Sequence, residues 1–279
     1  MKIAIICVSY NSYPDTIKMV ESIRQAQLKM PSMECLTVLV CDNSTQGNSD
    51  LLLNTISEYD FNYLKLENIG YFPAFYQGLK YLEKNNFNVF KDFDYVIVSN
   101  VDLQLDSKFF NNMYGLNINK DVGVVAPSIL SNLTKEDINP KVIVRPKKLK
   151  MKLLRLGFQN LWFYKSYTWL SVKKAEKRGK NKHLHHTYNP NISMYAAHGS
   201  IMVFTKEYFK RQASVNYPRF LFGEEVFVAE EAKNKGLTTI YKPELVVYDN
   251  EHGATSREAD RFISNEHVKS YNYLLENYY

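Results

Sequence analysis

The chain has 279 residues, of which 45% are hydrophobic, enough to form one large α/β domain or two smaller ones. Its apolar runs are too short to cross a bilayer, and the first apolar strand begins directly after Met1 and Lys2, so we expect neither a membrane span nor a signal peptide. Cys7, Cys35 and Cys41 lack metal-binding spacing, and we expect reduced thiols in a cytoplasmic protein.

The net charge of +6 conceals an uneven distribution along the chain. Residues 141–182 contain 14 Lys and Arg and a single acid, Glu176, whereas the remainder carries 21 bases against 28 acids. The chain is therefore a mildly acidic globule with one strongly basic segment, and that asymmetry calls for a local explanation.

Strands and helices are predicted to alternate along roughly the first 130 residues. Apolar runs predict strands at 3–8, 36–41, 63–66, 94–98 and 122–126, and apolar residues at helical spacing predict helices near 14–23, 50–58, 74–82 and 107–114. The run at 95–98 is apolar without a break, as in a strand buried on both faces. Alternation of this kind predicts a parallel, doubly wound sheet.

The second half is less regular. Residues 131–192 hold the basic segment, and the apolar stretch 195–204 around Gly199 is predicted to return to the sheet. A helix over 224–235, a strand over 245–248 and a helix from residue 256 complete the prediction.

Polar side chains collect where three of the predicted strands end. Asn11 follows the first strand, Asp42 and Asn43 follow the second, and Asn100 and Asp102 follow the fourth. Ligands of open α/β sheets bind outside the carboxyl ends of the strands, and a carboxylate there suits a divalent cation or a phosphate-bearing ligand. One such residue alone is more commonly a turn or cap residue, but three such ends favour a binding site. Neither a glycine-rich dinucleotide motif nor a P-loop follows the first strand.

Six segments, taken in order, resemble the motifs of family 2 glycosyltransferases with the GT-A fold. These segments are residues 8–11, 41–44, 68–70, 99–102, 222–225 and 251–256. The resemblance is to bacterial enzymes that build capsule, O-antigen and related polysaccharides, of the rhamnosyl- or galactosyl-transferring type. It implies a Rossmann-like α/β fold, with a mostly parallel sheet flanked by helices and an inserted basic amphipathic helical segment.

The resemblance also implies a donor site for a nucleotide sugar, of the UDP- or dTDP-linked kind. The residues that would bind the nucleotide are Ser9, Tyr10, Asn11, Asp42, Asn43, Asn68 and Asn100, with Asp42 accepting from the base or ribose. Asp102 and His252 would hold Mn²⁺ or Mg²⁺, which stabilises charge on the departing diphosphate, and an imidazole ligand leans toward Mn²⁺. A surface-loop histidine is the plain alternative for His252.

An inverting transfer needs one carboxylate to take the proton from the acceptor hydroxyl. By resemblance this base belongs to the Glu224–Glu225 pair, and alignment with the motif assigns it to Glu225, with Glu224 as the alternative. The family more often has Asp at this place and an acid where Phe227 stands. The structural alternative is that both acids complement the N-terminal dipole of the predicted helix.

Three further residues complete the predicted site. His198 and Gly199 lie in a small-residue turn that the family places beside donor and acceptor sugars, and Arg257 could contact the diphosphate. A packed histidine and a solvated helix cap are the respective alternatives.

The basic segment is also aromatic and amphipathic. Both tryptophans of the chain, Trp162 and Trp169, lie in it, and residues such as Leu149 and Leu153 interleave with lysines. Such a stretch suits an anionic membrane surface, single-stranded nucleic acid, or a helix packed on the domain with a solvated basic face. We favour the anionic inner-membrane surface as the partner of residues 147–182 and expect no nucleic acid. The resemblance agrees, because such enzymes commonly extend lipid-linked glycans at the inner leaflet.

Taken together with the resemblance, these patterns imply an inverting, metal-dependent glycosyltransferase of the hexosyltransferase type, acting at the cytoplasmic face of a bacterial membrane in surface polysaccharide synthesis. Its parts would be a nucleotide-sugar-binding half (1–130), a basic aromatic insertion (131–192) and an acceptor-side half (193–279). One alternative is a nucleotidyltransferase, which would normally carry a glycine-rich, basic triphosphate loop after the first strand. The other is a catalytically silent membrane or nucleic-acid binding protein of the same fold.

Overall fold

One mixed β-sheet runs from the first residues of the chain to the last quarter. The computed structural model describes residues 1–30, 32–45, 47, 49–85, 88–134, 136–181, 192–250 and 259–279. Across these residues the strand order is β3-β2-β1-β4-β8-β6-β9-β5, and β7 pairs with β9. The strands are β1 (Lys2–Ser9), β2 (Cys35–Asp42), β3 (Asn62–Lys65), β4 (Tyr95–Asn100), β5 (Leu103–Leu105), β6 (Val122–Ser131), β7 (Ser193–Met194), β8 (Ile201–Thr205) and β9 (Thr238–Asp249).

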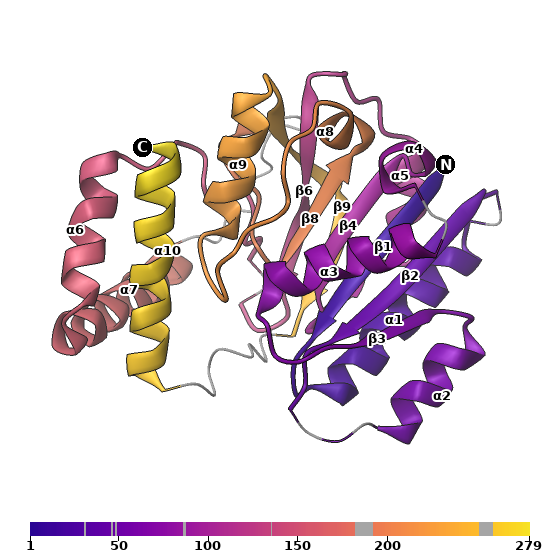
Figure 1. Ribbon diagram of the computed structural model, residues 1–279, viewed down its shortest axis with the longest axis horizontal. Coiled ribbons are helices and arrows are strands. Elements are labelled where there is room, and N and C mark those ends of the chain that lie inside the picture. Colours follow the sequence, from indigo (N-terminus) through magenta and orange to yellow (C-terminus); the bar gives the residue numbers. More distant parts are fainter. Residues whose placement is uncertain are drawn as a thin grey trace.

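Helices cover both faces of this sheet (Figure 1). They are α1 (Tyr13–Leu28), α2 (Asp50–Glu58), α3 (Tyr71–Lys84), α4 (Val89–Asp92), α5 (Phe109–Tyr114), α6 (Lys148–Phe158), α7 (Leu161–Asn181), α8 (Lys206–Lys210), α9 (Glu224–Asn234) and α10 (Asp260–Tyr278). α1, α2 and α5 pack on one face, and α3, α8 and α9 on the other.

The parallel half of the sheet follows directly from its sequence. In β1, Ile3, Ile5 and Cys7 enter the core under α1 and α2, whereas Ile6 and Val8 enter the core under α3. A strand buried on both faces must be apolar at every position, which explains the unbroken apolar runs of β1, β2 and β4. These strands pair in parallel, with β1 between β2 and β4.

The sheet is mostly parallel, as predicted, and its antiparallel pairs involve strands of the second half. β8 runs antiparallel to both β4 and β6, and β5 runs antiparallel to β9. An apolar run predicts a strand but carries no direction, and β8 enters the sheet after the long connection that bears α6 and α7. The three-residue strand β5 was not predicted, because it is too short to give a pattern.

The basic segment forms two helices that lie beside the sheet with α10 (Figure 1). Phe158 of α6, Tyr164 of α7 and Ile263 of α10 form a small buried cluster, and Met151 is buried as well. The packing alternative is therefore correct for one face of these helices. None of the described helices is both long enough and apolar enough to cross a membrane. All three cysteines are free thiols, as predicted.

Candidate active site

A cavity of about 440 Å³ opens at the carboxyl ends of the parallel strands. Its lining includes nine of the predicted site residues, namely Tyr10, Asn43, Asn68, Asn100, Asp102, His198, Gly199, Glu224 and Glu225. Ser9, Asn11 and Asp42 do not line it. The predictions for His252 and Arg257 lie outside the described residues.

One side of the cavity, which we call the amide side, consists of Tyr10, Asn43, Asn68 and Asn100. Asn43 is almost fully buried, and its Nδ2 donates to the carbonyl of Gly70 at 2.9 Å, which ties the end of β2 to the start of α3. Gly70 has φ +93°, and a Cβ there would lie 2.2 Å from the carbonyl oxygen of Phe220. Only glycine fits this approach of two backbones, so the 68–70 segment shapes the cavity wall.

Asp42 lies behind the amide side in a closed network. Its Oδ2 accepts from Tyr63 Oη at 2.6 Å and from Lys65 Nζ at 3.2 Å, and its Oδ1 accepts from Ser44 N at 2.8 Å. Burial alone would raise the pKa of this carboxyl, but the hydrogen bonds from Ser44, Tyr63 and Lys65 outweigh it and lower the pKa. Asp42 thus holds β2 and β3 together in this structure.

Ser9 and Asn11 also serve the architecture around the site. Ser9 Oγ shares a 2.8 Å hydrogen bond with Thr16 Oγ1, and both residues are fully buried. The side-chain oxygen of Asn11 accepts from Thr45 N at 3.0 Å, and its left-handed φ of 50° suits the Asn at this turn. These contacts fix the loop that presents Tyr10.

Asp102 stands where β4 gives way to β5. The backbone N–H of Asn100 donates to Ser200 O at 2.8 Å, and the carbonyl of Asp102 accepts from Asn250 N at 3.1 Å. This bond fixes Asn250, the last residue described before the range 251–258, at the backbone of Asp102. Among the described residues no group of three or more His, Cys, Asp or Glu side chains could hold a metal ion.

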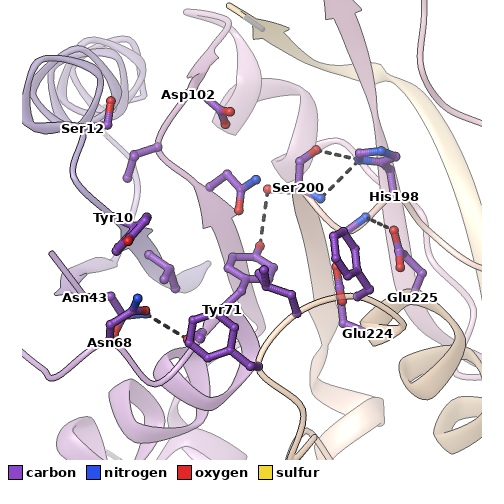
Figure 2. A pocket seen from close by; sticks show the side chains of 18 of the residues that line it. Tyr10, Ser12, Asn43, Asn68, Tyr71, Asp102, His198, Ser200, Glu224 and Glu225 are labelled. Atoms are coloured by element: carbon purple, nitrogen blue, oxygen red, sulfur yellow. Dashed lines mark hydrogen bonds between the residues drawn. The ribbon is translucent and has the colours of Figure 1, made fainter. Parts of the chain in front are cut away.

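The opposite side, which we call the acid-pair side, consists of Lys141, His198, Gly199, Glu224 and Glu225. Figure 2 shows His198 and the two glutamates across the cavity from Tyr10, Asn43 and Asn68. Two left-handed residues lead into α9, Phe222 with φ 65° and Gly223 with φ 87°. They turn the chain so that the first two residues of α9 face the cavity.

Close packing fixes the two glutamates. Glu225 Oε1 accepts from Gly199 N at 3.3 Å, and a Cβ on Gly199 would lie 2.5 Å from Glu224 Oε1. Burial, reinforced by the neighbouring charge of Glu225, raises the pKa of Glu224 to about 8. Glu224 is thus mostly protonated at neutral pH, a state that suits a hydrogen-bond donor better than a base.

His198 is held as a neutral ring. Burial, with a smaller contribution from Lys141, lowers its pKa to about 3. Lys141 Nζ lies 3.2 Å from Nε2, and an ammonium can only donate. On the other side of the ring, Nδ1 accepts from the backbone N–H of Ser200 at 3.2 Å and lies 2.9 Å from Ser200 Oγ.

Tyr71 lies between the two sides (Figure 2) and donates to Ser200 O at 3.5 Å. Burial and the carboxylates of Glu224 and Asp102 raise the pKa of Tyr71 well above its ordinary value, so its hydroxyl stays protonated. Sequence patterns missed Tyr71 and Lys141. Tyr71 directly follows the Asn68–Gly70 motif, and this position could have identified it as a site residue. Lys141 is one of many lysines in the basic segment, and no pattern distinguishes it from the others.

Comparisons with known proteins identify the fold but match the chain to no sequence family. No family model matches the chain, and no curated protein matches it in sequence. Among solved structures, residues 1–349 of TarS from S. aureus superpose with TM-score 0.54 and 11% identity, over 90% of this chain and 60% of that one. GalNAc-T7 with UDP, GalNAc and Mn²⁺ superposes with TM-score 0.55 and 10% identity, over 96% of this chain and 47% of that one. This chain therefore spans less than two thirds of either, and the similarities confirm the predicted GT-A fold.

Proposed function

We propose that the protein is a metal-dependent, inverting glycosyltransferase that moves a sugar from a nucleotide-sugar donor to a glycan acceptor. The observation that carries the proposal is one cavity that joins the Asp102 carboxylate, the amide side and the acid pair. The protein shares its fold with TarS and GalNAc-T7, which are glycosyltransferases. The GalNAc-T7 structure contains UDP and Mn²⁺.

The charges of the cavity favour a cation bound together with the donor. Asp102, Glu224 and Glu225 line the cavity, and Lys141 is the one positively charged side chain among the described lining residues. A nucleotide diphosphate is an anion and needs a counter-charge there. Asp102 and His252 would hold Mn²⁺ or Mg²⁺, which commonly bind through one or two protein ligands, phosphate oxygens and water. Bound there, the ion would neutralise charge on the departing diphosphate.

The amide side would bind the nucleoside. Tyr10 offers an aromatic face, and Asn43, Asn68 and Asn100 offer amide groups at the strand ends, where α/β sheets bind nucleotides. We infer a UDP- or dTDP-linked donor. Ser9, Asn11 and Asp42 would act by holding this wall in place, and Arg257 would contact the diphosphate.

Glu225 would be the base. The acceptor hydroxyl gives its proton to the Glu225 carboxylate, the hydroxyl oxygen bonds to the anomeric carbon, and the bond from that carbon to the diphosphate breaks with its electron pair on the nucleotide. The bond from Gly199 N orients the Glu225 carboxylate. Protonated Glu224 would donate a hydrogen bond, and Tyr71, also protonated, would donate from the centre of the cavity.

The α6–α7 surface would place the enzyme on an anionic membrane at its cytoplasmic side. Its outer face exposes Leu149, Leu153, Leu156, Trp162, Trp169 and Leu170, with Trp162 81% exposed. Lys150 and Lys152 of α6 are exposed as well, and exposed apolar and basic residues together are typical of a helix that lies in a membrane interface. A peripheral enzyme at that surface could reach a lipid-linked acceptor, as capsule or O-antigen synthesis requires.

A donor panel tests the proposal. Incubation with UDP-, dTDP- and GDP-sugars, Mn²⁺ and bacterial lipid extract should release one nucleotide, and NMR of the product should show inversion at the anomeric carbon. Glu225→Gln should lower the rate by about 10²–10⁴-fold, whereas Glu83→Gln, an exposed glutamate on α3, should not change it. Retention of anomeric configuration, or a Glu225→Gln variant as fast as wild type, would overturn this mechanism.

A further inference from the structure

Lys141 lies on the acid-pair side although its sequence neighbours belong to the basic segment. Residues 142 and 196 form an antiparallel bridge, and Tyr195 N donates to the carbonyl of Val142 at 3.1 Å. This pairing brings Lys141 beside His198 and into the lining of the cavity. Its position is thus set by backbone pairing, and its side chain is exposed to the cavity.

The Lys141 ammonium forms its hydrogen bond with a neutral group. Its hydrogen-bond partner is the neutral imidazole of His198, at 3.2 Å. Within the described part of the chain no carboxylate lies within 4.0 Å of its ammonium. Arg145, only four residues later, shows the contrast, because its guanidinium is paired with Glu230 through two bonds of 2.6 and 3.0 Å.

We propose that Lys141 binds an anionic group of the acceptor, a phosphate or a carboxylate close to the hydroxyl that reacts. This inference rests on the proposed function, since it assigns the acid-pair side to the acceptor. An ammonium on a flexible stem is a good point charge for either anion. Burial raises the pKa of Glu224, which reduces the negative charge on the acid-pair side that would oppose such an anion.

The position of Lys141 favours the acceptor over the donor diphosphate. Its ammonium lies 3.2 Å from His198 Nε2 and interacts at longer range with Glu224, both on the acid-pair side. The donor diphosphate would lie near Asp102, where a divalent cation supplies the counter-charge. A neutral acceptor would leave the ammonium with no anion to bind, so the lysine selects for charge.

Three small probes with the same carbon skeleton test this inference. Glycerol is neutral, glycerate carries a carboxylate, and glycerol 3-phosphate carries a phosphate beside hydroxyls. NMR titration into the full chain should show saturable binding of glycerate, glycerol 3-phosphate or both, and no binding of glycerol. The arm that binds more tightly identifies the anion.

The variants separate Lys141 from general charge. Lys141→Met should weaken binding of the anionic probe at least about tenfold, Lys141→Arg should retain it, and Lys152→Met, an exposed lysine on α6, should not change it. Binding of UDP or dTDP with Mn²⁺ should be equal in all four proteins. The inference is overturned if wild type binds neither anion, if Lys141→Met binds it as wild type does, or if that variant loses nucleotide to the same extent. If wild type binds no nucleotide but the anion result stands, the proposed function fails and the anion site survives.

Discussion

The two sides of the cavity manage their polar groups in opposite ways. Behind the amide side, Asp42 is enclosed by Tyr63, Lys65 and Ser44, and its charge is fully compensated by these neighbours. On the acid-pair side, Glu224 is buried next to another carboxylate, and the Lys141 ammonium has a neutral partner. Closed networks of this kind hold a fold together, whereas groups with uncompensated charge are the ones available for chemistry.

The largest expected effect separates two glycines on these opposite sides. Gly70→Ala puts a Cβ 2.2 Å from the backbone oxygen of Phe220 and forces a strained φ of +93°, so the free energy of unfolding should fall by about 3 kcal/mol. Chemical denaturation of wild type and variant measures this change in the free energy of unfolding. A loss below about 1 kcal/mol would mean that these two backbones do not meet as described.

Gly199→Ala should behave differently. Its Cβ would meet the Glu224 carboxylate at 2.5 Å, and a side-chain tip can move where backbone cannot. We expect a loss of stability of about 1 kcal/mol or less, with a loss of transfer activity that exceeds it because both glutamates are displaced. Equal losses of stability in the two variants would remove the distinction between the sides.

Acid should weaken the Asp42 network. The folded protein holds the pKa of Asp42 below that of the unfolded chain, so the stabilisation is present above about pH 4 and is lost as the pH falls through the folded value. Asp42→Asn should cost about 2 kcal/mol at pH 7 and flatten the stability curve at low pH. An unchanged curve in denaturant titrations from pH 2 to 7 would contradict the closed network.

The contribution of Glu224 to stability should depend on pH in the opposite direction. Its carboxyl ionises near pH 4.3 in the unfolded chain and at about 8 when folded, so the unfolded state releases its proton first and stability falls as the pH rises between these values. Glu224→Gln mimics the protonated form and should raise the free energy of unfolding by about 1–2 kcal/mol at pH 8, but not at pH 4. The same denaturant titrations at pH 4 and 8 would test this, and a Glu224→Gln variant that is destabilised at both pH values would contradict it.

The smallest expected effect concerns the α6–α7 surface. Both tryptophans of the chain lie on α7, so selectively excited tryptophan fluorescence reports this surface. Vesicles with anionic lipid should shift the emission to the blue, and about 0.5 M salt should reverse the shift. Leu153→Ser should weaken vesicle binding by about 1 kcal/mol, and Leu51→Ser, equally exposed on α2, should not. No shift with any vesicle would exclude this surface as a membrane site.

Sequence reasoning performed best where burial is uniform. The apolar runs of β1, β2 and β4 predicted strands, and the polar residues after them predicted the edge at which Asn43, Asn100 and Asp102 meet. It could not separate lining residues from supporting ones. Asp42 and Asn43 are adjacent in sequence. Asp42 contacts Tyr63 and Lys65 of β3, which pairs with β2, whereas Asn43 lines the cavity.

Long-range pairing accounts for features that the sequence patterns left open. Lys141 enters the site through a bridge between residues 142 and 196, a separation over which no periodicity carries information. The direction of β8 depends on how the chain returns after α6 and α7. Likewise, the basic segment is both a packed and an exposed element, since Met151 and Phe158 are buried while Leu149 and Leu153 are exposed on the same helix.

The most direct measurement is calorimetric titration of UDP, dTDP and GDP, with and without Mn²⁺, into wild type, Asp102→Ala and Asp121→Ala. Asp121 is an exposed acid that directly precedes β6, at the end of the sheet opposite the cavity. It serves as the matched control. We expect one nucleotide to bind wild type and Asp121→Ala only with Mn²⁺, and Asp102→Ala to lose at least about tenfold in affinity. Nucleotide binding that depends on neither Mn²⁺ nor Asp102, or no binding of any nucleotide, would contradict a metal-dependent donor site in this cavity.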